Sequence, residues 1–125
     1  MATHSTLRNS LADRAKNITR RELQTYTERT RGSQAATARA RTVMPMGVPS
    51  SFQYYDPHPI VVRRAQAAWM EDVDGNRYVD YDMGFGALFA GHVNPHVRAA
   101  IQQQLDDGTL YVTPCETNTD VAELL

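Results

Sequence analysis

The chain has 125 residues, of which 42% are hydrophobic and 22% charged, as in an ordinary globular protein with room for one domain. The first twenty residues are polar, unlike a secretory signal, and no apolar run approaches the length that spans a bilayer. The single cysteine, Cys115, excludes an intrachain disulfide and fits a reducing compartment, so we expect a cytoplasmic protein.

The net charge of −1 hides an uneven distribution of charge. Residues 1–41 hold nine basic and three acidic side chains, whereas residues 42–125 hold four arginines and eleven acids. A basic segment of this kind can bind nucleic acid, an acidic partner or an acidic surface of its own chain. Its one aromatic residue, Tyr26, offers no platform for stacking bases, which makes nucleic acid the weaker hypothesis. A non-catalytic interaction module that docks through this basic arm stays open as an alternative.

Residues 7–31 predict a helix with a thin apolar stripe, formed by Leu7, Leu11, Ala15, Ile18 and Leu23. Gly32 and Ser33 are expected to interrupt it, and residues 34–41 either resume the helix or form a linker. We interpret residues 1–42 as a basic helical N-terminal arm. So few large apolar residues predict that the arm needs another surface to order it.

Residues 43–59 contain four prolines and one glycine, which excludes a regular helix or strand. The aromatic residues in this loop suggest that the loop packs against another surface. The sequence leaves open whether they anchor a core or line a site.

The stretch DVDGNRYVDY at residues 72–81 carries three carboxylates, an amide and a glycine. A calcium loop that began at Asp72 would need glycine at its sixth position and glutamate at its twelfth, but Arg77 and Met83 stand there. The pair Asp74-Gly75 instead favours a type I′ hairpin turn. With strands predicted at residues 60–64, 67–72 and 77–81, the segment indicates a three-stranded antiparallel meander.

Glycines at positions 84, 86 and 91 follow the meander without matching the dinucleotide-binding pattern. Asn94 and Pro95 then predict the N-cap and first residue of a helix, with Gly108 expected at its C′ position. The apolar stripe of this helix would be Val97, Ile101 and Leu105. His92 and His96 have a zinc-ligand spacing, but the predicted cap separates them and no third ligand is evident, so no metal site is predicted.

Thr113-Pro-Cys-Glu116 predicts a capping box that opens a last helix carrying Val121, Leu124 and Leu125. A helix that stops on two leucines suggests a chain truncated at its C-terminal end. The exposed apolar face also predicts marginal stability and a tendency to associate.

The run DVDGNRYVDYDMGFGALFAGHVNPHVRAAI, followed by TPCETNTDVAELL, resembles the N-terminal part of class III aminotransferases. The most specific motifs are D-x-D-G-N-R-Y-x-D and G-H-x-x-P-x-V. Together with M-P-x-G-V at residues 44–48, they are most similar to the glutamate-1-semialdehyde 2,1-aminomutase-like branch. The DPHP stretch resembles the related β-amino-acid aminotransferases.

This resemblance implies an α/β fold, the N-terminal part of a fold-type I pyridoxal-phosphate-dependent transferase. Residues 43–125 would be the first segment of the aminotransferase domain. The intact enzyme would be a homodimer that moves an amino group between an amino acid and a keto or aldehyde substrate. In the family, the Schiff-base lysine, the aspartate that pairs with the pyridine nitrogen and the Ser-Gly-Thr phosphate loop all lie beyond this segment. Since Lys16 is the only lysine in the chain, we expect the segment to be inactive alone, without catalytic or cofactor-binding residues of its own.

The resemblance also implies four substrate-binding residues, namely Ser50, Phe52, Gln53 and Phe85. Phe85 stands where the family often has tryptophan, and Gln53 stands where the branch commonly has arginine. An arginine offers a carboxylate two charged donors, whereas glutamine offers one neutral amide, so a different carboxylate-binding arrangement is favoured. From the residues alone, both phenylalanines are more often core than site, Ser50 could be only a turn residue, and Cys115 a small buried filler.

Overall fold

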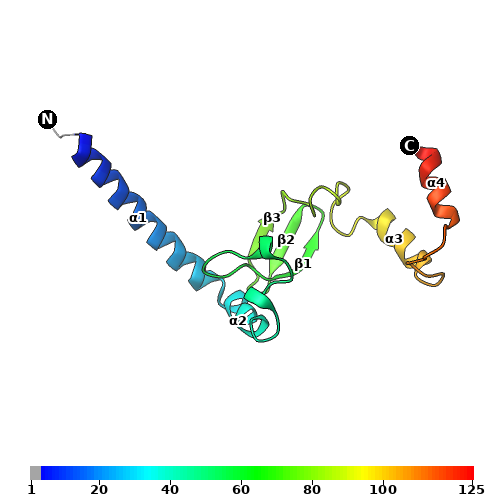
Figure 1. Ribbon diagram of the computed structural model, residues 1–125, viewed down its shortest axis with the longest axis horizontal. Helices are drawn as coiled ribbons and strands as arrows, with labels where there is room; N and C mark the ends of the chain where they lie inside the picture. Colours follow the sequence, from blue (N-terminus) through cyan, green and yellow to red (C-terminus); the bar gives the residue numbers. More distant parts are fainter. Residues whose placement is uncertain (1–3) are drawn as a thin grey trace.

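A computed structural model describes residues 4–125 of the chain (Figure 1). It shows a long helix on one side of a small sheet and the short C-terminal helices on the opposite side (Figure 1). The elements are α1 (His4–Arg29), α2 (Arg31–Ala40), the 3₁₀ turns η1 (Pro45–Gly47) and η2 (Ser51–Gln53), β1 (Val62–Gln66), β2 (Trp69–Asp72), β3 (Arg77–Val79), α3 (Pro95–Gln104) and α4 (Glu116–Leu124). No helix within residues 4–125 combines the length and the apolar character needed to cross a membrane.

The break between α1 and α2 lies at Thr30, so the predicted interruption at Gly32 and Ser33 is wrong. Thr30 leaves the helical conformation, with φ −124° and ψ 38°. Gly32 and Ser33 instead form the first turn of α2, because the Asp74 carboxylate accepts their backbone N–H groups at 2.5 and 2.9 Å. A carboxylate from a distant turn thus satisfies donors that the first turn of a helix leaves free. Residues 34–40 continue the helix and are not a linker.

The three strands form one antiparallel sheet in the order β1-β2-β3, which confirms the predicted meander. The hairpin between β2 and β3 is wider than the predicted type I′ turn. Gly75 has φ +84°, whereas Asp74 keeps a negative φ, and Gly75 donates its N–H to the Asp72 carbonyl at 3.1 Å. Strand β1 begins at Val62 instead of residue 60, and its pairing with β2 is irregular between Val62 and Arg64.

Most of the buried residues lie where the α1–α2 junction meets the sheet, and they are mainly polar. Val48 is the one buried large hydrophobic side chain among the residues whose burial the structure describes, 10–125. The Tyr26 hydroxyl donates to the His58 carbonyl at 2.6 Å, and the Ser33 hydroxyl accepts the Val61 N–H at 3.1 Å. These bonds pin the proline-rich loop against both helices. The buried polar residues are Thr30, Ser33, Thr37, His58, Asp72 and Asp80.

The C-terminal helices begin and end differently from the predictions, except at Asn94. Its side chain accepts the N–H groups of His96 and Val97 at 3.0 and 3.3 Å, which confirms the predicted N-cap of α3. The C-cap of α3 is Leu105, so Gly108, with φ +96°, is not at C′. Helix α4 begins after Cys115, and the predicted capping box at Thr113–Glu116 is therefore wrong.

Candidate functional site

The glycine-rich segment after β3 forms a left-handed turn. Four successive residues have positive φ: Met83 at 48°, Gly84 at 61°, Phe85 at 57° and Gly86 at 84°. Glycine adopts this conformation freely, but for Met83 and Phe85 it costs roughly 1–2 kcal/mol each. Such a turn persists only where neighbouring groups hold it in place.

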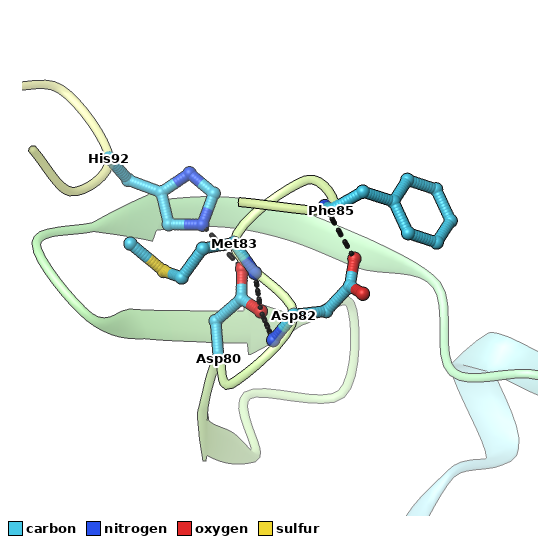
Figure 2. A network of polar contacts seen from close by, with 5 residues as sticks. All are labelled: Asp80, Asp82, Met83, Phe85 and His92. Atoms are coloured by element: carbon cyan, nitrogen blue, oxygen red, sulfur yellow. Dashed lines mark hydrogen bonds and ion pairs between the residues drawn. The ribbon is translucent and has the colours of Figure 1, made fainter. Parts of the chain in front are cut away.

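The carboxylates of Asp80 and Asp82 provide that support (Figure 2). Asp80 Oδ1 accepts the backbone N–H groups of Asp82 and Met83, both at 2.9 Å. Asp82 Oδ2 in turn accepts the N–H of Phe85 at 3.2 Å. Each carboxylate thus accepts donors from the residues that follow it, which is how aspartate stabilises a turn. The Phe85 side chain points away from this network (Figure 2).

His92 connects the far end of the segment to its beginning. Its Nε2 lies 2.7 Å from Asp80 Oδ2, and 19% of its side chain is exposed. The backbone of His92 forms a two-way bridge with Ala67, with N···O distances of 2.8 and 2.9 Å. Asp80 donates its own N–H to the Ala68 carbonyl at 2.8 Å. Residues 80 and 92 are therefore both anchored to the connection between β1 and β2.

The electrostatics of Asp80 agree with this geometry. The N–H group of Met83 and the imidazole of His92 hold the pKa of the Asp80 carboxyl below its usual range. The side chain is buried but charged, and it accepts three hydrogen bonds from the segment that it supports.

The structure brings Phe85 together with Phe52, which comes from the proline-rich loop. Their ring centroids are 5.2 Å apart and the ring planes meet at 66°, an edge-to-face arrangement. Phe52 is 63% exposed and Phe85 is 76% exposed, so neither ring belongs to the core of this chain. The core alternative for these two residues is wrong within the described residues.

Ser50 and Gln53 lie on the same loop, at either end of η2. Ser50 is extended, with φ −144°, and its carbonyl accepts the Gln53 N–H at 3.0 Å. Gln53 lines an open cleft of about 780 Å³ between α2, the loop and the sheet. Asp82, which holds Phe85, lines the same cleft, whereas Ser50, Phe52 and Phe85 are not among its lining residues.

The sequence did not predict the turn-stabilising roles of Asp80 and Asp82, nor the contact of His92 with Asp80. The sequence presents His92 only as half of a zinc-ligand spacing and as part of the G-H-x-x-P-x-V motif. The signal for the two aspartates was present, since an aspartate two or three residues before a glycine-containing turn can accept its backbone N–H groups. The partnership between Asp80 and His92 has no local signal, because twelve positions separate them.

The remaining candidate groups are accounted for by local contacts. Within residues 4–125, no group of three or more His, Cys, Asp or Glu side chains is arranged to hold a metal ion. Cys115 is half-buried at the start of α4 and its thiol donates to Asn118 Oδ1 at 3.2 Å, so it is not a buried filler.

Comparison with known proteins places this geometry in a family. The sequence profile described as aminotransferase class-III matches residues 51–125. The chain is 44% identical to glutamate-1-semialdehyde 2,1-aminomutase from Chloroflexus aurantiacus over 102 residues, 79% of this chain and 23% of that enzyme. It is 42% identical to the enzyme of the same name from Archaeoglobus fulgidus over 88 residues, 70% of this chain and 21% of that enzyme. The chain therefore spans less than a quarter of the length of these relatives.

Solved structures agree with the sequence comparison. A glutamate-1-semialdehyde aminomutase from Pseudomonas aeruginosa superposes with a TM-score of 0.78 at 30% identity, over 88% of this chain and 25% of that one. A β-phenylalanine aminotransferase from Variovorax paradoxus gives a TM-score of 0.75 at 25% identity, over 82% of this chain and 24% of that one. These matches show part of the fold-type I transferase fold, with its helices and small antiparallel sheet. The chain belongs to the class III aminotransferase family.

Proposed function

We propose that the chain is the N-terminal segment of a pyridoxal-phosphate-dependent class III aminotransferase or aminomutase. It would supply the substrate wall, by which we mean the substrate-contacting surface formed by Ser50, Phe52, Gln53 and Phe85. The enzyme would move an amino group between an amino acid and a keto or aldehyde substrate. The observation that carries this proposal is the exposed pair of Phe52 and Phe85, in which Phe85 is held on a strained left-handed turn, in a chain of this family. Strained backbone that presents an exposed ring is more typical of a binding site than of a scaffold.

The four substrate-wall residues would contact different parts of the substrate. The rings of Phe52 and Phe85 would contact the apolar part of the substrate, while Ser50 and Gln53 would donate neutral hydrogen bonds to its carboxylate. Gln53 borders the cleft that Asp82 also lines, which supports a position near the aromatic pair. A neutral amide binds a carboxylate more weakly than a guanidinium does, so this chain would rely more on ring contacts than an arginine-bearing relative.

The described residues do not fit pyridoxal phosphate by themselves. A Schiff-base lysine has to be desolvated to act as a nucleophile. Lys16, the one lysine of the sequence, is exposed on α1, the helix that extends away from the sheet (Figure 1). We therefore propose that the segment is inactive alone. The arm boundary near residue 42, the homodimer and the cytoplasmic location belong to the same proposal.

The first test is the coding sequence downstream of Leu125. An open frame that encodes a Ser-Gly-Thr loop, an aspartate and a later lysine would support the proposal. An immediate stop codon, with the short product made in cells, would exclude catalysis. The alternative, docking through the basic arm, would then take its place, because the Arg14–Arg21 part of α1 is exposed.

The second test measures steady-state kinetics of the full-length enzyme. Phe85→Leu should raise the KM for a carboxylate substrate about tenfold, which corresponds to about 1.4 kcal/mol of lost binding. Phe89→Leu is the matched control, since Phe89 is on the same segment and 92% exposed but outside the aromatic pair. Gln53→Arg should lower the KM for glutamate 1-semialdehyde. Equal KM values for Phe85→Leu and the wild type would contradict the substrate wall.

A further inference from the structure

The segment that carries Phe85 is closed at both ends by one pair of side chains. Asp80 opens the segment directly after β3, and His92 ends it, with their side chains 2.7 Å apart. Both residues are also tied by backbone hydrogen bonds to Ala67 and Ala68, in the connection between β1 and β2. The eleven residues between them therefore form a loop whose two ends are fixed to the same point of the sheet.

The two oxygens of Asp80 have separate partners. Oδ1 accepts the N–H groups that begin the left-handed turn, and Oδ2 faces His92 Nε2 (Figure 2). A rotation of the carboxylate away from His92 would also move Oδ1 away from Met83. Because Met83 and Phe85 are strained at positive φ, the turn would relax once this support is lost.

We propose that Asp80 and His92 are positioning residues for Phe85, which together hold its ring against Phe52. Neither residue touches the substrate in this proposal; they act through the turn and through Asp82. The inference rests on the proposed function only in its consequence for substrate binding. The positioning itself is a statement about the two rings and can be tested without turnover.

The test places 4-fluorophenylalanine at position 52 of the full-length protein and follows its fluorine resonance by NMR. The resonance reports the Phe85 ring, whose centroid lies 5.2 Å from that of Phe52. Phe85→Leu defines the position of the resonance when the ring contact is lost. His92→Leu removes the partner of Asp80, whereas His92→Gln keeps an N–H donor for Oδ2.

We expect His92→Leu to move the resonance at least half of the way to its position in Phe85→Leu, and His92→Gln to stay close to the wild type. Arg64→Gln is the control, because it removes a different contact of the same sheet, the ion pair of Arg64 with Glu71 at 2.6 Å, and should move nothing. An unmoved resonance in His92→Leu, or an equal shift in His92→Gln, would overturn the proposal. Circular dichroism checks folding, and Asp80→Ala, which removes both acceptor oxygens, decides by the same criterion if His92→Leu does not fold.

Kinetics then separate this inference from the proposed function. If both hold, His92→Leu raises the substrate KM with little change in kcat, and the double variant with Phe85→Leu binds no worse than Phe85→Leu alone. If the fluorine resonance moves but Phe85→Leu leaves KM unchanged, the positioning stands and the substrate wall is wrong. If Phe85→Leu raises KM but the resonance does not move in His92→Leu, the wall stands and the positioning is wrong.

Discussion

Residues 26–80 and residues 81–125 differ in how their chain is held. Among residues 10–125, whose burial the structure describes, all of the buried side chains lie in the first region, where backbone and side-chain groups of α1, α2, the loop and the sheet bond to one another. In the second region no residue is buried, although it contains several large apolar side chains, among them Tyr81, Phe89, Leu110 and Val112.

The difference lies in what each region needs from its surroundings. Carboxylates such as Asp72 and Asp74 satisfy backbone donors within the chain, so the first region is ordered by contacts that it contains itself. Helices α3 and α4 have ten and nine residues, which is short for a stable helix without packing. Their apolar faces are therefore available to another surface.

Acidification should have the largest effect on the stability of residues 26–80, because it protonates three carboxylates together, those of Asp72, Asp74 and Asp80. Burial alone would raise the pKa of Asp72, but hydrogen bonds from Asn76 and Tyr78 outweigh it and hold the pKa below its usual range. The pKa values of Asp74 and Asp80 are also lowered. Groups with a lowered folded pKa stabilise the fold above their unfolded pKa, and this stabilisation is lost as the pH falls through the folded pKa.

We therefore expect the Trp69 fluorescence of the sheet to stay constant from neutral pH down to about pH 4 and to change cooperatively below it. Amide exchange at the first turn of α3 serves as the internal comparison, since its cap, Asn94, does not titrate. A sheet that keeps its fluorescence at pH 2 would contradict the importance of the carboxylates.

Asp72→Ala should have the largest effect of any single substitution. Its buried carboxylate accepts four hydrogen bonds, from the N–H groups of Asp74 and Asn76, the Asn76 amide and the Tyr78 hydroxyl. Loss of these acceptors should lower the free energy of unfolding by about 3 kcal/mol, measured by urea denaturation. Burial, and after it the hydrogen bond to the same carboxylate, raises the pKa of Tyr78 to about 12 in the wild type. In Asp72→Ala the Tyr78 pKa should fall, which an ultraviolet titration of tyrosine detects.

Gly91→Ala should destabilise the closure of the 80–92 segment. Gly91 has φ +84°, and an added Cβ would lie 3.2 Å from the Ala67 carbonyl oxygen. Gly86→Ala is the matched control, because Gly86 has the same φ but nothing within 4 Å of its Cβ position. We expect about 1 kcal/mol of loss in Gly86→Ala from the backbone alone, and about 2 kcal/mol in Gly91→Ala. Equal losses in thermal melts would show that the contact with Ala67 contributes nothing.

Asp74→Ala should have a smaller effect, confined to the start of α2. Its carboxylate accepts the N–H groups of Gly32 and Ser33 and the Ser33 hydroxyl. Loss of a helix cap costs about 1 kcal/mol. Amide exchange should accelerate at Gly32 and Ser33 but not in β2. The prediction fails if exchange in the first turn of α2 is unchanged.

The sequence by itself determined the features that depend on neighbours along the chain. The alternation of strands and turn residues between residues 60 and 81 determined the meander, and Asn94-Pro95 determined the start of α3. The motifs of residues 44–125 were sufficient to predict the family. The meander and the start of α3 depend on backbone propensity or on hydrogen bonds across two to four residues.

Tertiary structure alone decided the features that join distant residues. The α1–α2 break moved to Thr30 because Asp74, 41 positions after Ser33, supplies the acceptor for the first turn of α2. The aromatic pair joins Phe52 with Phe85, and Asp80 meets His92 only after the glycine-rich segment folds back onto the sheet. No local pattern encodes such contacts, since they form only when separate elements reach their places together.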